Sequence, residues 1–156
     1  MSPFALLLGL FLPAIGAEGA AGLAQPVLLD MTRIERPATP NTCLAGPTGM
    51  TPAPDLITVE QTLPAAELYD KVLRVFGARP MVFVAAEFPA QRQVHFVARS
   101  ALMNYPDLIT VQVDPAGPRA STIVIWSRSL YGRKDFGVNQ ARVEAWLAAL
   151  RNSNER

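Results

Sequence analysis

The sequence predicts an α+β domain in which two helices cover one face of an antiparallel sheet of about five strands. Short runs rich in β-branched residues follow one another with polar turns between them, which favours antiparallel pairing. Two longer runs carry apolar residues at helical spacing. Each such helix has only one apolar stripe to bury, so both helices are expected to pack on the same sheet face. The expected order of elements is β-α-β-β-β-β-α.

The first strand and the first helix are adjacent in the sequence. Residues 56–62 (LITVEQT) are rich in β-branched side chains and predict a strand. Residues 65–76 follow helical spacing, with Pro64 suited to the first turn and Gly77 to the position past the helix end. The apolar stripe of this helix is expected to comprise Leu68, Val72, Val75 and Phe76.

Four strands and a second helix are expected in the rest of the chain. The strands are predicted at residues 81–86, 93–101, 108–113 and 120–127. The turn cluster DPAGPR at residues 114–119 joins the last two strands into a hairpin. The helix is predicted at residues 136–151, with Asp135 at its N-cap, because a carboxylate accepts hydrogen bonds from free backbone amides there. The buried stripe of this helix is expected to comprise Val143, Trp146, Leu147 and Leu150.

The chain divides into four predicted segments. They are a signal peptide or membrane anchor (residues 1–24), a Pro-rich arm (25–54), the α+β domain (55–151) and a polar tail (152–156). The nine residues FALLLGLFL carry no polar side chain and precede a proline and several small residues, which is the layout of a secretory signal. The alternative is an uncleaved anchor over residues 3–24, which would be the only contact with a membrane. We therefore expect an exported protein of the periplasm or cell envelope.

Composition excludes several classes of function. Half of the residues are hydrophobic, which excludes a disordered chain, and a net charge of +1 gives no indication of a nucleic-acid partner. The single cysteine, Cys43, and the single histidine, His95, exclude an all-cysteine or histidine-rich metal centre, so no metal or cofactor is predicted. Three roles stay open for Cys43: a buried thiol, a partner in an intermolecular disulfide, or a nucleophile paired with His95. No catalytic residue is predicted, and the sequence favours a protein without enzymatic activity.

One face of the predicted sheet carries the candidate binding residues. Alternation along the strands places an almost wholly apolar set of side chains under the helices and a mixed set on the opposite, second face. The candidates on that second face are His95, Arg99, Gln112, Trp126 and Arg128. Several interpretations remain open. The second face binds a protein partner or another copy of the chain, it is a shallow platform for a ligand, or it is an outer face partly covered by the Pro-rich arm.

The stretch from Ser127 to Arg142 (SRSLYGRKDFGVNQAR) predicts a set of hydrogen bonds that fixes the last helix to the last strand, called the latch below. Asn139 precedes Val143 by four residues and so lies on the buried stripe. A buried amide needs hydrogen-bond partners, and the backbone around Asn41 is expected to supply one. Arg142 is expected to pair with Asp135 or with a carbonyl of the arm.

An alternative interpretation of the same stretch is an anion site at the start of the last helix. Backbone amides near Gly137 would then hold a carboxylate or phosphate together with Arg128, Arg133 and Lys134. This site would make the chain a small-anion-binding protein or a weak enzyme.

Two stretches resemble the domain of unknown function 1499 family. The positions that match the C-terminal pattern of the family are Ser127, Ser129, Gly132, Asp135, Gly137, Asn139, Arg142 and Val143. The N-terminal pattern is matched by RPATPNTC at residues 36–43, which contains Asn41 and Cys43. The similarity covers about residues 36–150, with departures at Phe136 and Gln140. It implies a bacterial or plastid envelope-type protein with no established reaction.

Overall fold

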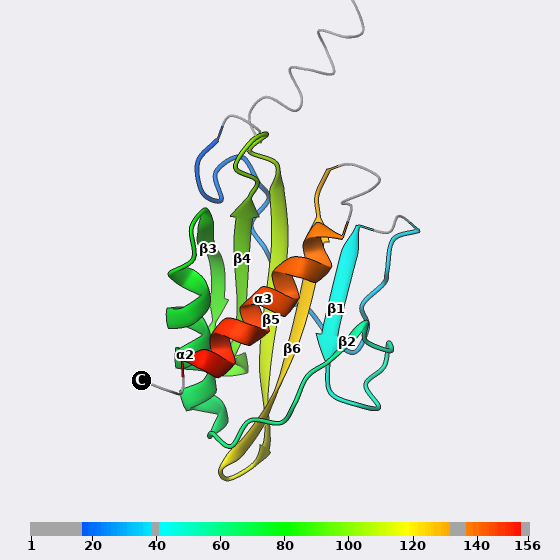
Figure 1. Ribbon diagram of the computed structural model, residues 1–156, viewed down its shortest axis with the longest axis vertical. Coiled ribbons are helices and arrows are strands. Elements are labelled where there is room, and N and C mark those ends of the chain that lie inside the picture. The colour runs from blue at the N-terminus through cyan, green and yellow to red at the C-terminus, as the bar shows by residue number, and fades with distance from the viewer. Residues whose placement is uncertain (1–16, 39–40, 132–136, 154–156) are drawn as a thin grey trace, which may run out of the picture.

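A computed structural model describes residues 17–38, 41–131 and 137–153 of the chain. A six-stranded sheet carries two helices on one face (Figure 1), with strand order β2-β1-β6-β5-β4-β3. The strands are β1 (Thr42–Gly46), β2 (Leu56–Ile57), β3 (Val82–Phe88), β4 (Gln93–Arg99), β5 (Pro106–Gly117) and β6 (Ala120–Ser129). The helices are α2 (Ala65–Gly77) and α3 (Val138–Asn152), and a 3-10 turn, η1 (Pro89–Gln91), joins β3 to β4.

The α+β class is confirmed, whereas the sheet differs from the expected antiparallel sheet of about five strands. The sheet has six strands and is mixed, because β1 and β2 run parallel and the other neighbouring pairs run antiparallel. The unpredicted strand, β1, lies within the segment that the sequence suggested was a Pro-rich arm. It occupies the proline-free interval between Pro40 and Pro47, so its amides remain available to pair with β6 and β2.

The predicted hairpin between the last two strands is confirmed and is longer than expected. Pairing of β5 with β6 runs from Asp107 opposite Ser129 to Gly117 opposite Ala120. Most of the residues 114–119, which the sequence assigned to the turn, therefore continue the ladder. This register sets which side chains of the two strands are neighbours on each face.

The two helices bury their apolar stripes against one sheet face. Trp146 of α3 contacts the rings of Phe76 in α2 and Phe96 in β4, with ring centroids 4.7 and 5.6 Å apart. Helix α3 begins at Val138, two residues later than predicted, and Gly137 takes the N-cap position with a left-handed φ of 80°. The buried members of the two stripes are Leu68, Val72, Phe76, Val143, Trp146 and Leu150.

The second face of the sheet is covered by the chain's own N-terminal segment, residues 17–37, which lies behind the sheet in Figure 1. Met31 and Ile34 pack on Trp126 in a small apolar cluster on this face. The side-chain amide of Gln93 forms two hydrogen bonds with the backbone of Leu29: the Leu29 N–H donates to Oε1 at 2.8 Å, and Nε2 donates to the carbonyl oxygen at 2.7 Å.

The structure therefore supports the interpretation in which the chain itself covers part of this face, and binding of a partner there stays a prediction. Trp126, His95 and Arg99 are 3%, 2% and 5% exposed. A tryptophan this large leaves a wide apolar area in water unless something covers it, and here the same chain supplies the cover.

The predicted leader is only partly within the described residues. Residues 17–24 belong to the N-terminal segment, and residues 1–16 lie outside the described part. Within residues 17–38, 41–131 and 137–153, no helix has the length and apolar character needed to cross a membrane. Export and anchoring stay predictions.

Replacing Trp126 with alanine is expected to destabilise the fold by about 3–5 kcal/mol, because it removes a buried ring and leaves a cavity. Equilibrium unfolding in denaturant measures this loss. Val59→Ala serves as the control, since Val59 is 71% exposed and the change should stay within about 0.5 kcal/mol. An unfolding midpoint for Trp126→Ala equal to that of the control would show that the N-terminal segment does not hold this face.

Candidate functional site

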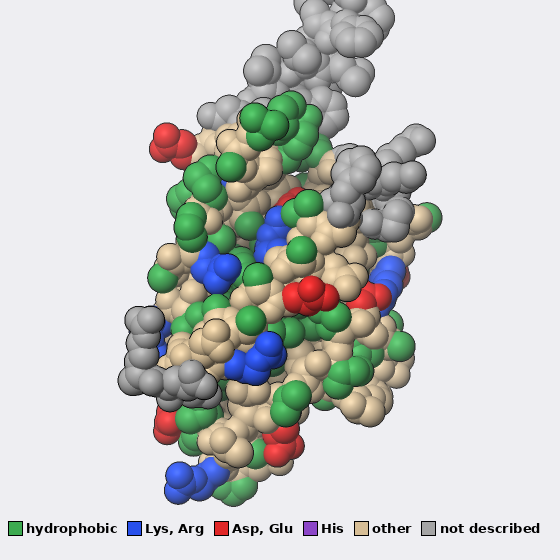
Figure 2. All heavy atoms as spheres, viewed as in Figure 1, with side chains coloured by type: hydrophobic (Ala, Val, Ile, Leu, Met, Phe, Trp, Pro, Cys, Tyr) green, Lys and Arg blue, Asp and Glu red, His purple; other side chains and the backbone are tan. Residues whose placement is uncertain are grey.

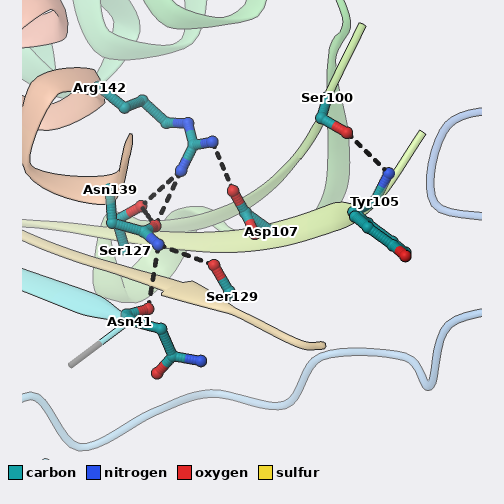
Figure 3. Close-up of polar contacts among 8 residues, drawn as sticks. All are labelled: Asn41, Ser100, Tyr105, Asp107, Ser127, Ser129, Asn139 and Arg142. Carbon is teal, nitrogen blue, oxygen red and sulfur yellow. Dashed lines mark hydrogen bonds and ion pairs between the residues drawn. The ribbon is translucent and has the colours of Figure 1, made fainter. Parts of the chain in front are cut away.

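A buried polar network joins the strands to the start of α3 (Figure 3). The Ser127 hydroxyl donates to Asn139 Oδ1 at 2.5 Å. Asn139 Nδ2 donates to the Asn41 carbonyl oxygen at 3.0 Å and to Ser129 Oγ at 2.9 Å. The contact that the sequence predicted between Asn139 and the backbone at Asn41 is thus present.

Arg142 extends this network to β5. Its Nη1 donates to Asn139 Oδ1 at 2.8 Å and to Ser127 Oγ at 3.2 Å. Its Nη2 forms an ion pair with Asp107 Oδ2 at 2.5 Å, and both side chains are largely buried. The partner expected from the sequence was Asp135 or an arm carbonyl. Asp135 and Gly132 lie outside the described residues, and the carboxylate that the fold brings to Arg142 is Asp107.

The geometry of this network makes it a structural latch. Ser127 and Asn139 are fully buried, and among the described residues no buried side-chain nitrogen or oxygen lacks a hydrogen-bond partner. The Ser127 proton points to an amide oxygen, which is too weak a base to activate a nucleophile. The network therefore holds β1, β5, β6 and α3 together.

Cys43 and His95 lie on opposite faces of the sheet, so the nucleophile and base that the sequence left open do not meet. The Cys43 thiol is 1% exposed and belongs to the core beneath the helices. His95 lies on the second face, beside Thr110 and Gln93. The burial of Cys43 also leaves no thiol surface in this fold for a disulfide with another chain.

His95 is held neutral within a row of polar side chains. Its Nδ1 is 2.9 Å from Thr110 Oγ1 and its Nε2 is 3.0 Å from Gln93 Oε1, so Nε2–H donates and Nδ1 accepts. Burial, reinforced by the positive charge of Arg128, lowers the pKa of His95 to about 4, against a smaller opposite effect of a backbone hydrogen bond at Val27. Gln112 joins the same row, because its Oε1 accepts a hydrogen bond from Gln93 Nε2 at 2.9 Å.

Arg99 binds the N-terminal segment. Its Nε donates to the Gly19 carbonyl oxygen at 2.7 Å, and its Nη2 donates to the Ala21 carbonyl oxygen at 3.3 Å. Its Nη1 donates to the Asn104 carbonyl oxygen at 3.1 Å, in the loop between β4 and β5. In this structure, Arg99 is thus a contact within the chain.

A cavity of about 450 Å³ lies between residues 20–27 and the second sheet face. Val97 and Leu108, which are register partners, form part of its apolar wall, and Arg128, the register partner of Leu108, lies beside them. The other lining residues are Ala20, Gly22, Leu23, Ala24, Gln25, Pro26, Val27, Ala85, Leu130 and Tyr131.

Arg128 is the charged side chain of this cavity. It is exposed, and it makes no ion pair or hydrogen bond with any residue in the described ranges. Arg128 does not join the amides at Gly137 in the alternative anion site, and Arg133 and Lys134, its other two cations, lie outside the described residues. Ser127 points towards α3, so Arg128, the next residue of the strand, points to the opposite face.

Three residues with a part in these polar contacts were absent from the predicted candidates. They are Asp107, which pairs with Arg142, and Gln93 and Thr110, which contact His95. Asp107 lies opposite Ser129 in the hairpin, a register that counting back from the predicted turn at residues 114–119 does not give, because the ladder continues to Gly117 and shifts between Pro115 and Gly117. In the part of the chain that the structure describes, no group of three or more His, Cys, Asp and Glu side chains could hold a metal ion.

Comparison with known proteins identifies a matching family model and solved structures of distant similarity. The family model is described as a protein of unknown function, DUF1499, and matches residues 35–150. No curated protein matches the chain.

One solved structure with a similar arrangement is the di-domain ARO/CYC protein BexL from the BE-7585A biosynthetic pathway, at 17% identity and a TM-score of 0.45. That match covers 62% of this chain, which spans 44% of BexL. Another is a solution NMR structure from Thermobifida fusca, at 14% identity and a TM-score of 0.46, covering 70% of this chain and 89% of that one. At these levels neither structure bears on function.

Replacing Asn139 with alanine is expected to lower the free energy of unfolding by about 2–4 kcal/mol, because it leaves several buried polar groups without partners. Denaturant unfolding provides the measurement. Gln140→Ala is the matched control on the same helix, since Gln140 is exposed and bonds only Glu144 among the described residues. Equal stability of the two variants would contradict the role of Asn139 as the centre of the latch.

Stability is expected to fall as the pH drops from 6.5 towards 4, because the unfolded chain protonates His95 in this range and the folded chain does not. The lowered pKa corresponds to a loss of about 3 kcal/mol at pH 4 relative to pH 7. Unfolding measured at both pH values, for the wild type and for His95→Gln, separates this loss from the titration of carboxylates. A loss of equal size in both proteins would exclude His95 as its source.

Proposed function

The chain belongs to the DUF1499 family of proteins of unknown function, and we propose that it binds a small organic anion with an apolar body in the cavity beneath its N-terminal segment. The observation that carries this proposal is the guanidinium group of Arg128, an exposed residue that lines the cavity and has no carboxylate or hydrogen-bond partner among the described residues. A cavity of about 450 Å³ is within the range of small-molecule sites.

Charge complementarity favours an anion. Arginine stays protonated at any ordinary pH. None of the described residues that line the cavity is Asp or Glu. His95, which is near Arg128, is neutral at pH 7 because its pKa is lowered to about 4. An anionic group would therefore meet a positive charge that the protein itself leaves uncompensated.

Shape and composition favour an apolar body on that anion. Leu23 and Leu130 are partly exposed and Val27 is 74% exposed, so these three residues offer aliphatic surface in the lining of the cavity. Covering such surface releases water and contributes about 25 cal/mol per Å² buried. A carboxylate with an alkyl or aromatic body satisfies both parts of the cavity.

We also propose that the protein is exported, as the apolar run at residues 4–12 indicates. Cleavage after Ala24 would remove Gly19 and Ala21, which hold Arg99, and part of the cavity wall. A processed chain would also lack Ala20, Gly22, Leu23 and Ala24 of the cavity lining, so the proposed site belongs to the chain that keeps residues 20–24.

This proposal keeps the second sheet face as the binding face and replaces a protein partner with a small molecule. Met31 and Ile34 cover Trp126, so a flat protein interface would need to displace them. The cavity needs no such displacement. The proposal involves binding alone and assigns no reaction to these residues.

Octanoate is expected to raise the melting temperature of the purified protein, whereas octanol at the same concentration raises it much less. A ligand at 100 times its Kd stabilises the folded state by about 2.7 kcal/mol. Arg128→Gln should abolish the difference between octanoate and octanol. Arg119→Gln, an exposed arginine in the β5–β6 turn, should retain it. The proposal fails if octanol stabilises as well as octanoate, or if Arg128→Gln leaves the octanoate shift unchanged.

A further inference from the structure

We propose that the loop between β4 and β5, residues 100–105, inserts its tip into the surface of a lipid bilayer. Leu102 is 92% exposed, Met103 52% and Tyr105 40%. Single exposed apolar side chains are common on protein surfaces, whereas three of them within four residues of one loop form a patch. This inference concerns a different surface from the cavity and does not depend on ligand binding.

The patch continues onto the start of β3. Met81 and Phe83 are 42% and 37% exposed. The Arg99 N–H donates to the Met81 carbonyl oxygen at 2.9 Å, so the start of β3 lies beside the end of β4, from which the loop leaves. Figure 2 shows hydrophobic side chains gathered at this end of the molecule, at the top of the view.

The loop is held in one conformation. Ser100 and Tyr105 close it at its base. The Ser100 N–H donates to the Tyr105 carbonyl oxygen at 3.0 Å, and the Tyr105 N–H donates to Ser100 Oγ, also at 3.0 Å (Figure 3). Asn104 adds a third bond, from its N–H to the Ser100 carbonyl oxygen at 2.9 Å. A loop already fixed with Leu102 pointing into water loses little conformational entropy when that side chain enters lipid.

The chemistry of the loop suits the interface between lipid and water. Residues 100–105 (SALMNY) carry no charge, so insertion requires no ion to leave water. Burying a leucine or methionine side chain contributes about 1.5–3 kcal/mol. Tyrosine favours the headgroup level, where its ring is in an apolar layer and its hydroxyl remains hydrated.

The course of the chain favours lipid over a protein partner. Asn104 Nδ2 donates to the Ala17 carbonyl oxygen at 3.1 Å, so the loop contacts the point at which the described chain begins. The apolar run Phe4–Leu12 ends five residues before Ala17, and five residues span at most about 18 Å. If that run lies in a bilayer as an anchor that stays attached to the chain, the loop is therefore within reach of the same bilayer.

The test uses the full chain with Leu102→Cys, labelled with a fluorophore that reports the polarity of its surroundings. Val59→Cys is the matched control, because Val59 is also exposed and apolar but lies between β2 and α2. Cys43 is 1% exposed, and wild-type protein labelled in parallel gives its background. The vesicles contain phosphatidylcholine and phosphatidylglycerol, with and without a quencher attached to the lipid chains.

We expect a blue shift and quenching by the lipid-attached quencher at position 102, and neither at position 59. Unchanged emission at position 102 in the presence of vesicles would overturn the proposal, whether or not the chain is tethered to them. A blue shift at position 102 that is already present without vesicles and disappears on dilution would also overturn it, because the loop would then contact another copy of the chain.

Discussion

The carboxamide of Asn139 is the group on which the arrangement of the sheet and the last helix depends. Its oxygen and nitrogen together bind Ser127 and Ser129 of β6, the backbone of Asn41 beside β1, and Arg142 on its own helix. Residues 41 and 139 are far apart in the sequence, so this one amide closes a long loop in the chain. Buried polar networks specify a unique arrangement only when every member is satisfied, and the described part of this one is.

The network around position 139 also accounts for several residues of the β6–α3 connection that the sequence indicated. A serine supplies the hydroxyl at position 127, and Arg142 carries the network to Asp107 on β5. An ion pair as buried as Arg142 with Asp107 contributes less to stability than to fixing which elements meet, since both charges lose water when they pair. This network is therefore a requirement of the fold, and the functional surface that we propose lies elsewhere on the domain.

That surface is the second face of the sheet, which the chain covers unevenly. Met31 and Ile34 close it over Trp126, whereas residues 20–27 leave a cavity beside Arg128. Arg99 and Asn104 fix the N-terminal segment at the same end of the sheet as the loop 100–105. The proposed ligand and the proposed lipid contact are chemically compatible. An anion with an apolar body gathers at lipid surfaces, and the loop 100–105 would bring this end of the sheet to such a surface.

The sequence by itself determined the local elements and the side of the sheet on which each side chain lies. Val94, Phe96 and Ala98 lie under the helices and His95 lies opposite, because alternation is a local property of an extended chain. The burial of Asn139 was predictable for the same reason, from its spacing along α3. The tertiary structure alone decided that β1 forms between two prolines, that Arg142 pairs with Asp107, and that Arg128 faces a cavity away from α3. These outcomes depend on which distant segments meet, and the periodicity of a single segment carries no information about its partner.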